Sequence, residues 1–117
     1  MATENNRPGA YKLIAFENAM RTIEAMRGVV AVVRKHDADL ARQLVRAASS
    51  VAANVAEGSQ RVGKDRLHLF RVAAGSAEET RAHLLVALAW GYLTSSEAEA
   101  PMKLIDKELR LLSGLTR

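Results

Sequence analysis

The chain has 117 residues, which is the size of one domain and enough to bury a hydrophobic core without a disulfide or metal staple. It contains no cysteine, which excludes disulfide bonds, thiolate chemistry and cysteine-based metal sites. Glycine (7), proline (2) and aromatic residues (4%) are scarce, which favours helices over a two-layer β protein, and the formal net charge of +4 is compatible with an acidic or nucleic-acid partner.

The sequence carries no signal for export or membrane insertion. Its first thirty residues hold no apolar run after a basic start, and no stretch approaches the roughly 18 consecutive apolar residues of a membrane span. We therefore expect no membrane partner. The lack of cysteine is consistent with a cytoplasmic location.

Residues 1–10 are polar and include Pro8 and Gly9, so we expect a flexible N-terminal tail followed by one domain over residues 11–117. The first helix is predicted over residues 12–36, because apolar residues recur there at steps of three and four. They are Leu13, Phe16, Met20, Ile23, Met26, Val30 and Val33. Asp37 and Asp39 can cap the start of the next helix.

A second helix is predicted over residues 39–57. Its apolar stripe consists of Leu40, Leu44, Ala47, Ala48, Val51 and Val55. Gly58 stands where a helix C-terminus favours a residue with positive φ, so we expect the helix to end there.

A third helix is predicted over residues 64–90, ended by Gly91. Its main apolar face consists of Leu67, Phe70, Ala74, Ala77, Leu84, Leu85 and Leu88. Thr94 and Glu97 have the spacing of a capping box, which predicts the start of a fourth helix. The apolar face of that helix consists of Met102, Ile105, Leu109, Leu112 and Leu115.

Pro101 falls inside the fourth helix. Proline lacks a backbone donor and clashes with the preceding turn at about 3 kcal/mol, so we expect a kink there or a helix that restarts near Ala100. Short connections between four helices imply antiparallel neighbours. The predicted fold class is therefore all-α, an up-down-up-down antiparallel four-helix bundle.

The third helix has more apolar surface than one core needs. Opposite its main face lie Leu69, Val72, Ser76, Glu79, His83, Val86, Ala87 and Trp90. On the first helix, Val29 and Val32 lie beside the main row. Contiguous exposed apolar surface usually marks an interface, so we predict a homo-oligomer. Its interface candidates are Leu69, Val72, His83, Val86 and Trp90. The alternative is that these residues are scattered and half-exposed, as many apolar residues are.

The second helix has a polar row beside its apolar stripe, among small residues that allow close helix approach. The row consists of Gln43, Arg46, Ser50, Asn54, Glu57 and Arg61. Unpaired buried polar groups cost roughly 1–3 kcal/mol, so we predict a structural network with partners from the third helix. Its members are Ser50, Asn54, Glu57, Arg71, Ser76 and Glu79. We expect Asn54→Leu or Glu57→Ala to disturb folding or assembly. A carboxylate pair of Glu57 with Glu79 is the alternative.

No enzymatic motif is present. A di-iron bundle needs Glu-x-x-His segments, whereas this chain has a single Asp-x-x-His at Asp65 and His68. The chain also lacks a nucleophile elbow and a glycine-rich phosphate loop. We therefore predict no catalytic residue, no metal, no cofactor and no enzyme.

Basic residues near the predicted helix ends are candidates for binding RNA or DNA, because phosphates attract clustered cations. They are Arg34, Lys35, Arg42, Arg46, Arg61, Lys64 and Arg66. No aromatic residue accompanies them in the sequence, so base stacking is not indicated. The alternative is a solvated charged face on a scaffold that binds only protein.

Residues 50–58 (SVAANVAEG), followed by Arg61, resemble the Ser-(Ile/Val)-x-x-Asn-(Ile/Val)-Ala-Glu-Gly segment of a bacterial four-helix bundle family. Its members are typically encoded in intervening sequences of 23S ribosomal RNA genes, and the family includes the accessory variability determinant of diversity-generating retroelements. Residues 70–79 (FRVAAGSAEE) resemble its Arg-x-Ala-x-Gly-Ser-x-x-Glu segment, and residues 85–93 and 112–115 also fit. Gly63, where a serine-type cap is common, and Pro101 depart from the pattern and put the local helix ends in doubt.

The resemblance spans residues 12–116 and implies a barrel-like homopentamer of four-helix bundles without catalytic activity. It also implies, for the retroelement branch, an accessory partner of a reverse transcriptase that associates with nucleic acid. The sequence does not assign the chain to either branch.

Overall fold

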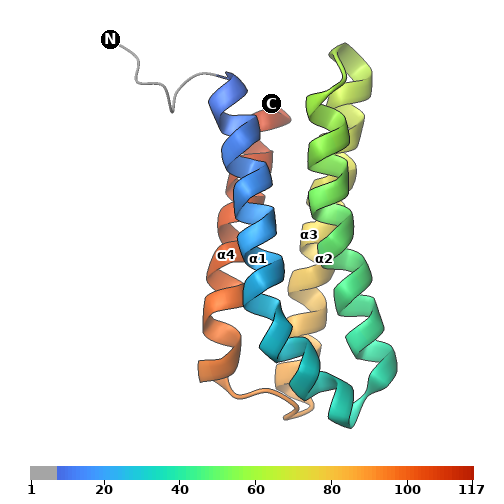
Figure 1. Ribbon diagram of the computed structural model, residues 1–117, viewed down its shortest axis with the longest axis vertical. Coiled ribbons are helices and arrows are strands. Elements are labelled where there is room, and N and C mark those ends of the chain that lie inside the picture. Colours follow the sequence, from blue (N-terminus) through green and yellow to red (C-terminus); the bar gives the residue numbers. More distant parts are fainter. Residues whose placement is uncertain (1–7) are drawn as a thin grey trace.

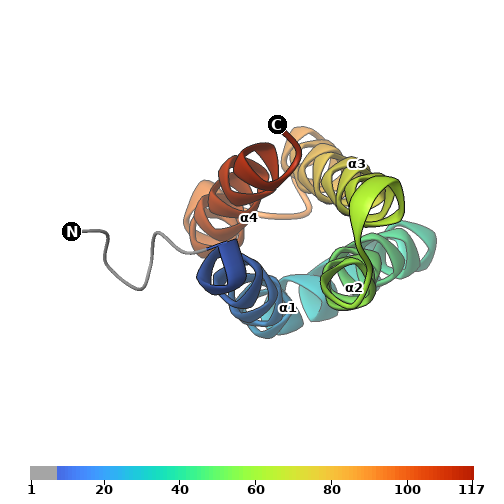
Figure 2. The same ribbon diagram turned by 90° about the horizontal axis from the view of Figure 1, so that it is seen from above.

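The computed structural model describes residues 8–117, which form α1 (Pro8–His36), α2 (Ala38–Ser59), α3 (Gly63–Ala89) and α4 (Ser95–Leu115). Successive helices run in opposite directions (Figure 1). Helices α1 and α3 each contact both α2 and α4, so α1 and α3 lie diagonally across the bundle (Figure 2). These contacts confirm the predicted all-α, up-down-up-down four-helix bundle.

The first helix begins earlier than predicted. Pro8 to Ala10 belong to α1 and not to a tail, while residues 1–7 of the predicted tail lie outside the described residues. Proline suits the first position of a helix because its φ is already helical and its missing N–H needs no partner there. Reading Pro8 and Gly9 as loop residues was therefore wrong.

Two predicted helix starts are confirmed. The Asp37 carboxylate accepts a hydrogen bond from the Leu40 N–H at 3.0 Å and caps α2. At α4, Thr94 Oγ1 accepts from the Glu97 N–H at 3.1 Å, and Glu97 Oε1 accepts from the Thr94 N–H at 2.9 Å. This capping box satisfies two donors that the helix itself leaves free.

Gly58 was predicted to end α2, but it lies buried inside the last turn of the helix. A Cβ atom at this position would lie 2.8 Å from Phe70 Cε1 and 3.3 Å from Leu69 Cβ. The glycine therefore serves the close approach of α2 and α3. Within residues 8–117, positive φ occurs at Gly63, at the start of α3, and at Gly91, which follows α3 as predicted.

Pro101 lies within an unbroken α4, so the predicted restart near Ala100 does not occur. The hydrogen bond that proline cannot make would have reached the carbonyl of Glu97, in the first turn of the helix. The Pro101 ring is fully buried. We infer that its packing in the core offsets the missing bond.

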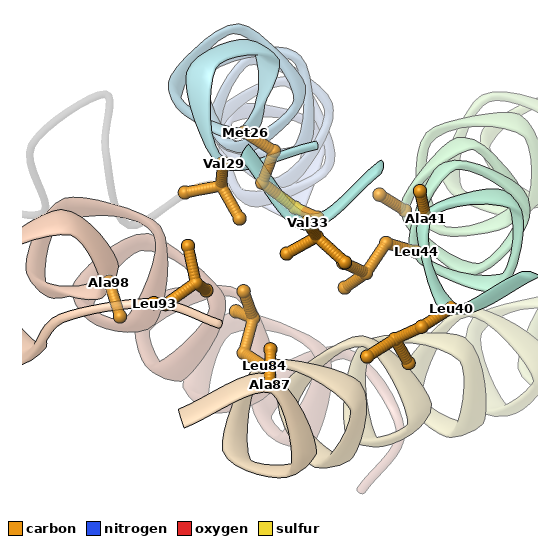
Figure 3. Packing of buried hydrophobic residues seen from close by; sticks show 11 residues of the cluster. Met26, Val29, Val33, Leu40, Ala41, Leu44, Leu84, Ala87, Leu93 and Ala98 are labelled. Carbon is orange, nitrogen blue, oxygen red and sulfur yellow. The ribbon is translucent and has the colours of Figure 1, made fainter. Parts of the chain in front are cut away.

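The core has two clusters, one toward each end of the bundle. The cluster nearer the α1–α2 turn draws side chains from all four helices and the α3–α4 connection (Figure 3). It includes Met26, Val29, Val33, Leu40, Leu44, Leu84, Leu93 and Ala98. The other cluster includes Ala15, Ala19, Val51, Val55, Phe70, Ala73, Ala77, Ile105 and Leu112.

The buried faces of α1 and α3 are rotated from those predicted. Leu13 and Met20 are 58% and 40% exposed, while Val29, expected as surplus, is in the core. On α3, Ala87 is buried and Leu85 is exposed, the reverse of their predicted places. Many of the core positions at the Phe70 end of the bundle are alanines, which let the helices approach closely. The size of an apolar residue therefore does not by itself mark the core of these two helices, since Phe70 and Leu84 are buried but Leu13, Met20 and Leu85 are not.

Replacing Gly58 with alanine tests the close contact of α2 and α3. Phe70 is fully buried and cannot swing away, so the added methyl group overpacks the core by about 1–3 kcal/mol. We expect a lower melting temperature by differential scanning calorimetry. Gly75→Ala is the control, since nothing lies within 4 Å of a Cβ there, and the helix preference of alanine should raise stability by up to about 1 kcal/mol. Equal effects of the two substitutions would contradict this role of Gly58.

Candidate interaction surfaces

A row of polar contacts joins α2 to α3 on one side of the bundle. The Ser50 and Ser76 hydroxyl oxygens lie 2.8 Å apart, and Asn54 Nδ2 donates to the Ser50 carbonyl at 2.9 Å and to its hydroxyl at 3.1 Å. The sequence-predicted network thus has Ser50, Asn54 and Ser76 in direct contact. All three are half-buried, so these bonds leave few polar groups without a partner.

Glu79 is the centre of a second group on the same side. Its carboxylate accepts from Arg46 and is 3.2 Å from His83 Nε2, while Arg46 also donates to Gln43 at 2.8 Å. Partial burial raises the pKa of Glu79, but the bonds from His83 and Arg46 outweigh it and the net shift is downward. Arg46, predicted for nucleic-acid binding, is therefore occupied by an ion pair.

Glu57 and Arg71 stand outside this network. Glu57 pairs with Arg61 at 3.3 Å, both side chains are about half exposed, and Arg71 is exposed. Among the described residues, no hydrogen bond links either of them to Ser50, Asn54, Ser76 or Glu79, and Glu57 forms no carboxylate pair with Glu79. Because exposed i,i+4 pairs contribute only about 0.3–0.5 kcal/mol, Glu57→Ala has little effect on the fold of one subunit.

The predicted interface residues follow one edge of α3 beside this polar row. Val72, Val86 and Trp90 are exposed, Trp90 by 70%, while Leu69 and His83 are half-buried. We call this edge of α3, together with the polar row of α2, the α2–α3 face. It presents an apolar stripe with a polar centre.

A second apolar surface lies between α1 and α2, at residues other than Val29 and Val32, which the sequence had suggested as surplus on the first helix. It carries exposed Leu13, Met20 and Val45 with half-buried Phe16 and Val30. Two hollows lie along it, of ≈ 310 Å³ near Val30 and Val45 and ≈ 420 Å³ near Leu13 and Phe16. We call it the α1–α2 face. The sequence pattern predicted that these α1 residues lie in the core, so this surface could not be recognised from the sequence.

The seven predicted basic residues do not form one cluster. Arg34, Lys35 and Arg42 lie in the helix ends near the α1–α2 turn, and Arg61, Lys64 and Arg66 lie in or near the α2–α3 connection. Arg42 and Arg61 are about 28 Å apart along α2 at 1.5 Å per residue. Arg42 pairs with Asp39, and Arg66 donates to the Arg61 carbonyl, so several of these cations already have partners.

Aromatic rings accompany one basic group after all. The rings of His36 and Tyr92 are stacked with their centroids 5.0 Å apart, and the rings of Tyr92 and Trp90 are stacked with their centroids 6.3 Å apart. His36 follows Arg34 and Lys35 in the last turn of α1. The sequence did not reveal this stack because the α3–α4 connection brings distant residues to the end of α1.

A buried polar pair crosses the core between α1 and α4. Asn18 Nδ2 donates to Glu108 Oε1 and to the Leu104 carbonyl, both at 2.9 Å. Burial raises the pKa of Glu108 to about 7, although the bond from Asn18 opposes the shift. Asn18 Oδ1 and Glu108 Oε2 have no partner among the described residues. When Glu108 is protonated, its O–H group is a hydrogen-bond donor at a place where these two buried oxygen atoms otherwise have no donor.

This pair makes stability depend on pH. The pKa of Glu108 is higher in the folded state than in the unfolded state, so its contribution is complete below about pH 4.5 and is lost as pH rises to about 7. At 1.36 kcal/mol per pKa unit, the loss is on the order of 3 kcal/mol. We expect urea unfolding of the parent to show this fall and Glu108→Gln, which is neutral at every pH, to lack it. Glu17→Gln, on the exposed side of α1, should fall like the parent. A pH-independent parent would contradict the assignment.

Among the described residues, no group of three or more histidine, aspartate or glutamate side chains could hold a metal ion. None of the four helices in that part of the chain is both long and apolar enough to cross a membrane.

The helix order and the contacts define an all-α four-helix bundle protein. The family model of the 23S rRNA-intervening sequence protein matches residues 11–114, and the chain therefore belongs to this family. A crystal structure of a protein with unknown function from the S23 ribosomal protein family of Bacteroides thetaiotaomicron has the same fold. It aligns with a TM-score of 0.83 at 16% identity and covers 95% of this chain and 98% of its own. No curated protein matches the chain.

Proposed function

We propose that the protein is a non-enzymatic, homo-oligomeric accessory protein, a ring of five subunits, that binds nucleic acid or a nucleic-acid-handling protein such as a reverse transcriptase. The observation that carries the proposal is the presence of two separate apolar surfaces on one subunit. Ring number five and the reverse transcriptase rest on the family resemblance alone.

The two faces differ in character, which favours a head-to-tail contact between copies. The α1–α2 face is hollowed and apolar, whereas the α2–α3 face combines protruding Val72, Val86 and Trp90 with the Arg46–Glu79 pair. Two different patches that bind each other make a heterologous interface, and such interfaces generate rings when the rotation closes. Because α1 and α3 lie on either side of α2 (Figure 2), the two faces lie on different sides of the bundle, and each subunit can contact two neighbours at once.

The nucleic-acid role is supported by charge. The subunit carries +4, and a ring repeats each basic end group around its rim, so phosphate contacts add up. A scaffold that binds only protein is the second candidate, favoured by the acidic residues that occupy Arg42, Arg46 and Arg61.

Charged substitutions on the two faces test the ring. Leu13→Asp with Met20→Asp alters the α1–α2 face, and Val72→Asp with Val86→Asp alters the α2–α3 face. These side chains are exposed in the subunit, so both double variants should fold but sediment as single subunits. Each variant retains one intact face, so an equimolar mixture should form a one-to-one pair and nothing larger.

Val62→Asp, in the exposed α2–α3 connection, is the control and should assemble like the parent. A self-complementary interface would let one variant pair with itself and would give no mixed pair. That outcome, or a double variant that assembles normally, would contradict the head-to-tail ring.

Binding of labelled RNA and duplex DNA tests the accessory role. Phosphate contacts are strongest at low salt, so we expect binding at about 50 mM salt and a steep loss by about 200 mM. Absence of binding to both at about 50 mM would leave the protein-only scaffold as the function.

A further inference from the structure

A basic hollow of ≈ 510 Å³ lies between the start of α1 and the end of α4. It is lined by Tyr11, Lys107, Arg110, Leu111, Gly114 and Arg117. Three of these six residues are cations and none is acidic. The three cations come from the last eleven residues, and α1 adds Tyr11 to the hollow.

The three cations share one side of the chain end. Lys107 and Arg110 lie about one turn apart on α4, and Arg117 follows the end of that helix at Leu115. At a rise of about 1.5 Å per residue, Lys107 to Leu115 alone spans about 12 Å, which is longer than one phosphate group. The N-terminus of α1 and the C-terminus of α4 lie together here, so their opposite dipoles offset each other. The side-chain charges therefore set the local potential.

Among the described residues, these three cations have no acidic partner, and unlike the other cations without one they line a single hollow that contains no acidic residue. Within residues 8–117, ion pairs occupy Arg42, Arg46, Arg61, Arg81 and Lys103. No hydrogen bond or ion pair from another described residue reaches Lys107, Arg110 or Arg117, which are all exposed. The nearby acids are withdrawn, because Asp106 pairs with Arg81 and Glu108 is fully buried. Within residues 8–117, no acidic side chain therefore pairs with the cations of the hollow.

We propose that this hollow binds successive phosphate groups of an unpaired nucleic-acid strand. Cations spread along a helix suit a chain of phosphates, and the exposed ring of Tyr11 offers a stacking surface that only an unpaired base can reach. The inference rests on the proposed nucleic-acid role and assigns its site. That site lies at neither of the two basic turns expected from the sequence.

The test is a triple variant, Lys107→Gln, Arg110→Gln and Arg117→Gln, titrated with a labelled single-stranded RNA at several salt concentrations. Each lost contact to a single strand lowers the salt slope by about 0.7, so three lower it by about 2. We expect affinity near 50 mM salt to fall by about tenfold or more. The matched control is Arg21→Gln, Arg71→Gln and Lys103→Gln, which removes the same charge from exposed positions elsewhere and should leave the slope unchanged.

The outcomes separate the site from the role. An equal loss of affinity and slope in both triple variants would overturn the hollow as the site while leaving nucleic-acid binding intact. A parent that binds no RNA would overturn both. Inorganic tripolyphosphate distinguishes a nucleic-acid strand from a free phosphate compound. If the parent binds tripolyphosphate but not RNA, and the Lys107, Arg110 and Arg117 variant loses that binding, the ligand is a small polyphosphate and the proposed strand is wrong. Circular dichroism checks that both variants remain helical.

Discussion

Four helices around one core can each bury only the side that faces the others, and the rest of the structure depends on this limit. Small residues decide which side that is. Ala15 and Ala19 bring α1 into the core, and Gly58 lets the Phe70 ring pack against α2. Larger apolar residues such as Leu13 and Met20 are thereby left at the surface. The same close packing that stabilises the subunit thus creates the two apolar faces, which we propose identical copies cover for each other.

Most of the fold could be predicted from the sequence. The helical spacing of apolar residues located all four helices. Asp37, Gly91 and the Thr94–Glu97 box marked helix boundaries, because the hydrogen bonds and the φ angle at these boundaries depend on residues close in the sequence. The errors had a different origin. Gly58 has a role set by Phe70, and the rotation of α1 is set by alanines that any helix face tolerates. Both depend on contacts across the bundle, which one helix considered alone does not contain.

The candidate sites were less accessible to sequence reasoning. The contacts of Ser50 with Ser76 and of Arg46 with Glu79 follow from polar spacing on two adjacent helices, so part of the network could be foreseen. The Asn18–Glu108 pair, the His36–Tyr92–Trp90 stack and the Lys107–Arg110–Arg117 hollow could not. The first two features join residues that are far apart in the chain. The hollow is noticeable only because its cations have no acidic partner among the described residues. Charge spacing alone therefore pointed to the two helix turns instead.

We propose that a subunit does not persist alone, because its exposed apolar side chains require a copy of the same chain. The experiment is sedimentation velocity of the parent at micromolar concentration. We expect a single species several times heavier than one chain, with the fluorescence of Trp90, the one tryptophan in the sequence, shifted to shorter wavelength by burial. A stable single subunit at that concentration, with Trp90 emitting as in water, would contradict it.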